Sequence, residues 1–114
     1  MESIEIKIST DFSLTPGPRY IHEGKNSGEK FRKEVLFPKM KEALAKKISI
    51  TVNLDGTDGY GTSFLEESFG GLIRNNELDY KEIMANLTLI SDEEEYLIDD
   101  VHEYLKDAYE ESQK

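Results

Sequence analysis

The sequence lacks cysteine and tryptophan, and it contains only three prolines and two histidines. Without cysteine, the chain can form neither a disulfide framework nor a zinc site built on thiolates. The two histidines, His22 and His102, lie far apart, and no pattern of acidic residues around them is typical of a metal site. We therefore expect no metal and no cofactor, and the composition suits a reducing, cytoplasmic environment.

Positive charge and long apolar stretches are also scarce. The chain carries 14 basic and 24 acidic residues, a formal net charge of −10. Nucleic-acid binding depends on clustered basic residues, so this balance argues against it. No apolar run approaches the roughly 20 residues that cross a bilayer, and the first residues are acidic instead of forming an apolar signal segment. We expect a soluble domain that binds neither nucleic acid nor membrane.

Apolar side chains recur at regular periods along the 114 residues, of which 37% are hydrophobic. That length and composition fit a single domain over residues 1–114 with one core. Alternation at period two predicts strands at 4–8, 48–54 and 87–90, and less distinctly at 12–20. Helical spacing predicts helices at 27–46, 63–75, 80–84 and 91–108, with Pro38 either kinking the first or starting a second.

Helix starts are predicted by residues that can cap a helix and are followed three positions later by glutamate. Such a pair forms a capping box, in which each side chain bonds to the backbone of the other residue. The pairs are Asn26 with Glu29, Ser63 with Glu66, and Ser91 with Glu94.

The alternation of strands and helices is typical of an α/β sheet with parallel crossover pairs. One face of the 48–54 strand is small and polar, formed by Ser49, Thr51 and Asn53, which favours helices on the other face. The sequence thus predicts a mixed sheet of about four strands with helices mainly on one face. The periods place these residues together in the core: Ile50, Val52, Phe69, Leu72, Leu97 and Val101.

Charge is distributed unevenly along the chain. Residues 92–114 contain ten acids and two lysines, a local net charge of −8. Residues 25–47 contain eight bases and three acids, a local net charge of +5. Two solvated helix faces of opposite sign explain this pattern most simply. The alternative is that one face steers a charged partner, since complementary fields speed encounter.

The segment from Asp55 to Ser63 is rich in glycine and joins a predicted central strand to a helix. In open α/β sheets ligands bind at this place, and the free amides of a helix start favour anions. Asp55 and Gly59 are candidate ligand contacts there, and Arg19 is a candidate anion contact, although a lone loop arginine usually pairs with an acid. The segment lacks a Walker ending, the dinucleotide glycine spacing and a nucleophile elbow.

Three blocks of sequence carry a resemblance to a known family. They are residues 17–20 (GPRY), 27–32 (SGEKFR) and 59–72 (GYGTSFLEESFGGL). Together they resemble the STAS-like family of bacterial domains known as DUF4325. The resemblance implies a STAS-like fold, similar to that of the anti-sigma factor antagonists.

In those antagonists a strand ends in a short loop whose hydroxyl is phosphorylated by a partner kinase. The resemblance places the corresponding loop at Gly61, Thr62 and Ser63, here called the 61–63 loop. This sequence differs in having Gly61 in place of aspartate and Phe64 in place of glycine. Ser63 also heads a capping box, so its simplest role is to cap the helix.

The leading functional hypothesis is therefore a regulatory protein-interaction domain. Its partner would be a protein such as a kinase-like ATPase or a sigma regulator, and the 61–63 loop would be its control point. The alternative is a domain that senses a small ligand or nucleotide through residues 55–63. We expect no enzymatic activity, because no pair of nucleophile and base is evident in the sequence.

Overall fold

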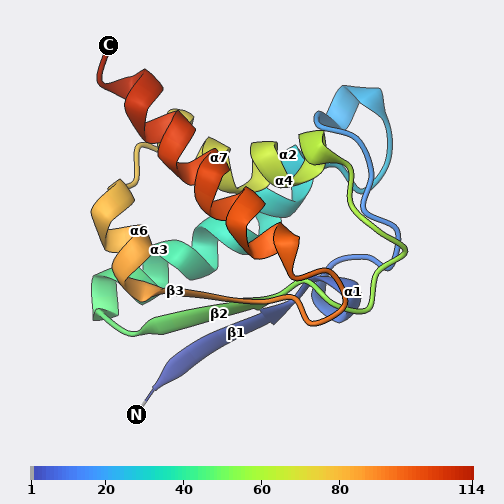
Figure 1. Cartoon of the computed structure of the whole chain (residues 1–114), viewed down its shortest axis with the longest axis horizontal. Helices are drawn as coiled ribbons and strands as arrows, with labels where there is room; N and C mark the ends of the chain where they lie inside the picture. Colours follow the sequence, from blue (N-terminus) through green and yellow to red (C-terminus); the bar gives the residue numbers. More distant parts are fainter. Residues whose placement is uncertain (1) are drawn as a thin grey trace.

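The computed structural model describes residues 2–114 (Figure 1). Its strands are β1 (Ser3–Lys7), β2 (Ser49–Asn53) and β3 (Leu87–Ile90). Its α-helices are α1 (Ile8–Asp11), α2 (Gly28–Phe31), α3 (Phe37–Lys46), α4 (Thr62–Leu65), α5 (Gly71–Arg74), α6 (Tyr80–Asn86) and α7 (Tyr96–Ser112). A 3₁₀ turn, η1 (Ile21–Glu23), and two π-helical turns, η2 (Arg32–Leu36) and η3 (Glu66–Gly70), complete the elements.

The three strands form a parallel sheet in the order β1-β2-β3. The register pairs Ile6 with Val52, and Val52 with Leu89. The prediction of about four strands in a mixed sheet was wrong, because residues 12–20 form no strand. Pro16 and Pro18 lack backbone donors, and the carbonyl of Pro18 instead accepts the amide of Gly28 at 2.9 Å.

The sheet buries one face under helices, as its side-chain pattern predicts. Figure 1 shows the sheet at the base of the molecule with α2, α3, α4, α6 and α7 above it. Ile6, Ile50 and Val52 point into the core and are at most 1% exposed. Thr51 and Asn53 lie on the opposite face and are partly exposed. A small polar face tolerates water, so this sheet needs only one layer of helices.

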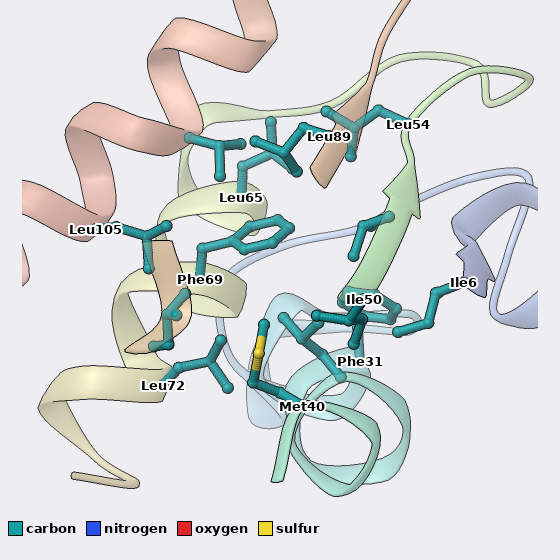
Figure 2. Close-up of a cluster of buried hydrophobic side chains, with 14 of the residues drawn as sticks. Ile6, Phe31, Met40, Ile50, Leu54, Leu65, Phe69, Leu72, Leu89 and Leu105 are labelled. Atoms are coloured by element: carbon teal, nitrogen blue, oxygen red, sulfur yellow. The ribbon is translucent and has the colours of Figure 1, made fainter. Parts of the chain in front are cut away.

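The predicted core residues are all buried together (Figure 2). Leu97 is the most exposed of the six at 7%, and Phe69 has no exposed surface. Aromatic rings fill the space between helices α2 and α4, where the centroids of Phe31 and Phe64 lie 5.8 Å apart. Along α7 the predicted stripe of Leu97, Val101, Leu105 and Ala108 is buried.

Helices α2 and α3 form one continuous helix that contains the π-helical turn η2. Pro38 lies directly after this turn, at the second position of α3. A proline inside a helix removes a hydrogen bond and crowds the preceding turn. The wider π turn accommodates that change, so the helix neither ends nor restarts at Pro38.

None of the three predicted capping boxes forms. The first helix is capped by Ser27, whose hydroxyl accepts the amide of Lys30 at 3.0 Å, while Asn26 adopts a positive φ of 57°. Helix α4, where the Ser63–Glu66 box was predicted, has Gly61 at its N-cap and no side-chain cap. The last helix begins after Glu95, and the Ser91 hydroxyl donates to the carbonyl of Glu94.

Candidate functional site

The segment between β2 and α4 is anchored by Asp55. Its carboxylate accepts hydrogen bonds from the amides of Asp92 at 3.1 Å and Glu93 at 3.0 Å. In return, the amide of Gly56 donates to the Glu93 carboxylate at 2.7 Å. These bonds tie together the loops that follow β2 and β3, so the Asp55 carboxylate serves the fold at this edge of the sheet.

Tyr60 fixes the segment from its other end. Its hydroxyl donates to the carbonyl of Leu54 at 2.7 Å, and its ring centroid lies 5.8 Å from that of Phe64. Burial raises the pKa of Tyr60 to about 12, so the hydroxyl stays protonated and keeps donating at neutral pH. Gly59 has a φ of 127°, which favours glycine, and its amide donates to the Thr57 hydroxyl at 3.2 Å.

The three residues named the 61–63 loop follow Tyr60 and are all exposed. They do not form a separate loop, because Gly61 is the N-cap of α4 and Thr62 begins that helix. Thr62 and Ser63 occupy the first two positions of α4, so Ser63 lies two residues past the N-cap, Gly61, and does not cap the helix. Within residues 2–114 the Ser63 hydroxyl forms no hydrogen bond. Thr62 lies near Tyr104 of α7: burial raises the pKa of Tyr104, and a hydrogen bond with Thr62 opposes the shift. Both residues are exposed at the start of α4.

An ion-pair network that the sequence patterns did not predict begins one helical turn after this loop, at Glu66 and Glu67. At its centre the Arg32 guanidinium pairs with the Glu67 carboxylate at 2.9 Å. Both side chains are almost fully buried, at 3% and 4% exposure. Arg32 also donates to the side-chain carbonyl of Asn76 at 2.8 Å. A buried pair of this kind requires tight geometry, since each charge has lost its hydration.

Two further arginines close the network around Glu66. Arg19 forms an ion pair with Glu66 and lies 3.5 Å from the Glu67 carboxylate. Arg74 pairs with Glu66 at 2.9 Å and with Glu67 at 3.3 Å. Burial alone would raise the pKa of Glu66, but hydrogen bonds from Arg74 and Arg19 outweigh it and lower the pKa. The stabilisation this gives is therefore present near neutral pH and is lost as the pH falls through that lowered value.

The network brings together the three blocks that carry the family resemblance. Arg19 comes from residues 17–20, Arg32 from 27–32, and Glu66 and Glu67 from 59–72. Gly71 of the third block leaves room for Arg32, because a Cβ there would collide with the guanidinium nitrogen Nε. These blocks therefore build a structural frame that leaves the 61–63 loop at the surface.

The structure thus sorts the predicted site residues into two groups. Asp55, Arg19 and the Gly59 amide bond within the protein, whereas Gly61, Thr62 and Ser63 are exposed. Arg19 pairs with acidic side chains, as a loop arginine usually does. Glu66, interpreted from sequence as a capping partner, belongs to the ion-pair network instead.

Among residues 2–114, no group of three or more His, Asp or Glu side chains is placed to hold a metal ion. In the same part of the chain, no helix has the length and hydropathy required to cross a membrane.

Comparison with known proteins identifies the family. The model of a family described as a STAS-like domain of unknown function (DUF4325) matches residues 27–97. No curated protein and no solved structure matches the chain. The match covers more than half of the sequence, including the helix of Arg32, the 61–63 loop and the Glu66–Glu67 pair. The chain therefore belongs to the DUF4325 family of STAS-like domains.

Proposed function

We propose that this domain is a regulatory protein-interaction module that contacts its partner through the 61–63 loop. The observation that carries the proposal is the exposure of Thr62 and Ser63 at a helix start beside the central strand. Anchors on both sides support it, because a loop held by Tyr60 and by the network around Glu66 presents its hydroxyls in a defined position. The partner is a protein, such as a kinase-like ATPase or a sigma regulator.

Phosphorylation of Thr62 or Ser63 would control this contact. A phosphate adds about two negative charges, and the free amides of the first helical turn accommodate them. Glu66 and Glu67, one turn further along, pair with three arginines, so this network keeps a net charge of +1, and its Arg19 and Arg74 side chains are 27% and 41% exposed. The domain can therefore carry the phosphate without unfolding, while an acidic partner surface is repelled.

We expect the serine to contribute nothing to the fold. Ser63→Ala should change the free energy of unfolding by less than about 0.5 kcal/mol, because its hydroxyl does not cap the helix. Urea denaturation followed by circular dichroism measures this. A loss of about 1 kcal/mol or more is typical of a cap and would show that the helix start differs from the one described.

The absence of cysteine permits a direct test of the contact surface. Ser63→Cys introduces a single thiol for a photo-crosslinker, and Ser49→Cys is the matched control at the opposite end of β2. In lysate of the native host, Ser63→Cys should crosslink one protein in high yield, and Ser49→Cys should not. Adding Thr62→Glu should reduce the yield, whereas Thr62→Gln should not. Equal yields from the two cysteine positions would refute the proposal.

The alternative, a sensor of small ligands or nucleotides, has less support. Such a site would use Asp55, Gly59 and Arg19, whose polar groups already bond within the protein. A thermal-shift series with nucleotides and with inorganic phosphate separates the two hypotheses. The interaction module predicts an unchanged midpoint, and a saturable increase would favour the sensor.

A further inference from the structure

A groove of about 820 Å³ lies on the far side of the ion-pair network, between the second half of α7 and the 75–81 segment. Figure 1 shows α7 passing above α6 and this segment as it runs to its C-terminal end. Most of its lining residues are polar or charged, and its apolar part consists of the buried Ile73 and Ala108 and the partly exposed Leu78. Tyr80 and Tyr109 form an aromatic wall, with centroids 4.7 Å apart and rings inclined by 12°.

Two of the acidic side chains that line the groove already bond to other parts of the protein. Glu66 is paired with Arg74, so that pair brings little net charge to the surface. Asp79 caps α6, accepting the amides of Lys81 at 2.8 Å and Glu82 at 3.3 Å. These acids are not available to attract a partner.

Three further acids and one lysine line the groove. Glu77, Asp107 and Glu111 line it together with Lys81, which leaves it negative. Glu111 does pair with Lys114 at 3.2 Å, but the two side chains are 73% and 75% exposed. An exposed pair of this kind is weak and exchanges readily for another cation. The groove thus combines apolar surface, stacked aromatic rings and more carboxylates than lysines.

We propose that this groove binds an arginine-rich segment of a partner protein. The aliphatic stem of an arginine covers apolar surface while its guanidinium reaches carboxylates and stacks on aromatic rings. Leu78 supplies apolar surface for the stem, Tyr80 and Tyr109 supply aromatic rings, and Asp107 and Glu111 supply the carboxylates. The net charge of −8 over residues 92–114 adds long-range attraction for a basic partner. This site is separate from the 61–63 loop and does not depend on its phosphorylation.

The test uses the whole domain and two short peptides. One peptide is arginine-rich, and the other carries citrulline, a neutral analogue, at every arginine position. The groove variant combines Asp107→Asn with Glu111→Gln. The control variant combines Glu103→Gln with Glu110→Gln, which removes the same charge from the same helix outside the groove. Thermal unfolding of each variant confirms that the fold is intact.

We expect the arginine peptide to bind the unmodified domain and the citrulline peptide not to bind. The groove variant should weaken arginine-peptide binding by about tenfold, and the control variant by less than about twofold. Equal weakening by the two variants would show only a solvated acidic face and would overturn the proposal, as would absence of binding. Sedimentation measures the oligomeric state of the domain. A dimer that the groove variant disrupts would overturn the proposal, because the groove would then bind a second copy of this chain.

Discussion

Glu67→Ala should lower the free energy of unfolding by about 3–5 kcal/mol, the largest effect we expect from changing a polar residue. The substitution leaves the Arg32 guanidinium, only 3% exposed, without its carboxylate partner. An uncompensated buried charge costs more than the lost pair contributed, because its hydration is not restored. Urea denaturation followed by circular dichroism measures the change.

An exposed pair provides the control for this prediction. Glu42 and Lys46 lie 2.9 Å apart on α3, with both side chains about half exposed at 50% and 51%. Glu42→Ala should cost less than about 0.5 kcal/mol. Replacing both buried partners by apolar residues, Arg32→Met with Glu67→Leu, should recover much of the loss caused by Glu67→Ala. A loss below about 1 kcal/mol for Glu67→Ala would mean that Arg32 finds solvent or another acid.

Phe69→Ala should destabilise the domain by about 3–5 kcal/mol through the cavity it leaves. The ring has no exposed surface and lies in the middle of the cluster drawn in Figure 2. It belongs to the helix that carries Leu65 and Leu72, which are also buried, so the surrounding helices cannot easily collapse into the space.

Tyr96 provides a matched aromatic control, since its side chain is 61% exposed at the start of α7. Tyr96→Ala should cost less than about 0.5 kcal/mol. If the two substitutions had similar effects, Phe69 would face solvent and the assigned phase of its helix would be incorrect.

The elements that sequence reasoning predicted well are those whose side chains repeat at a regular period. The alternation from Ile48 to Leu54 predicted the central strand, and Leu97 and Val101 predicted the buried side of α7. Burial on one face imposes these periods directly, so they can be read without knowing the rest of the fold. The strand at 87–90 was predicted with its observed ends.

Local signals failed where several residues could make the same bond. Asn26 and Ser27 can both cap a helix, and in the structure Ser27 is the cap while the next amide, that of Gly28, donates to the carbonyl of the distant Pro18. Ser63 with Glu66 fits a capping box, but Arg19 and Arg74 engage that glutamate instead. A competition of this kind depends on distant segments, so no short sequence pattern reveals it.

The sequence could indicate the position of the 61–63 loop but not its surroundings. Its position after a central strand follows from general rules for α/β sheets, and in the structure Gly61 is the N-cap of α4. The network beneath it depends on Arg19, Arg32 and Glu67, which are far apart in sequence. The three sequence blocks contained these residues, but only the fold shows that they meet.

Phosphorylation of the 61–63 loop is tested most directly by mapping phosphate on the domain purified from its native host. Intact mass gives the number of phosphates, and fragmentation of the peptide containing Gly61, Thr62 and Ser63 locates them. We predict one phosphate, on Thr62 or Ser63, that is lost when the modified residue is replaced by alanine. A loop without phosphate, together with undiminished crosslinking of the partner by the Thr62→Glu variant, would contradict control of partner binding at this loop.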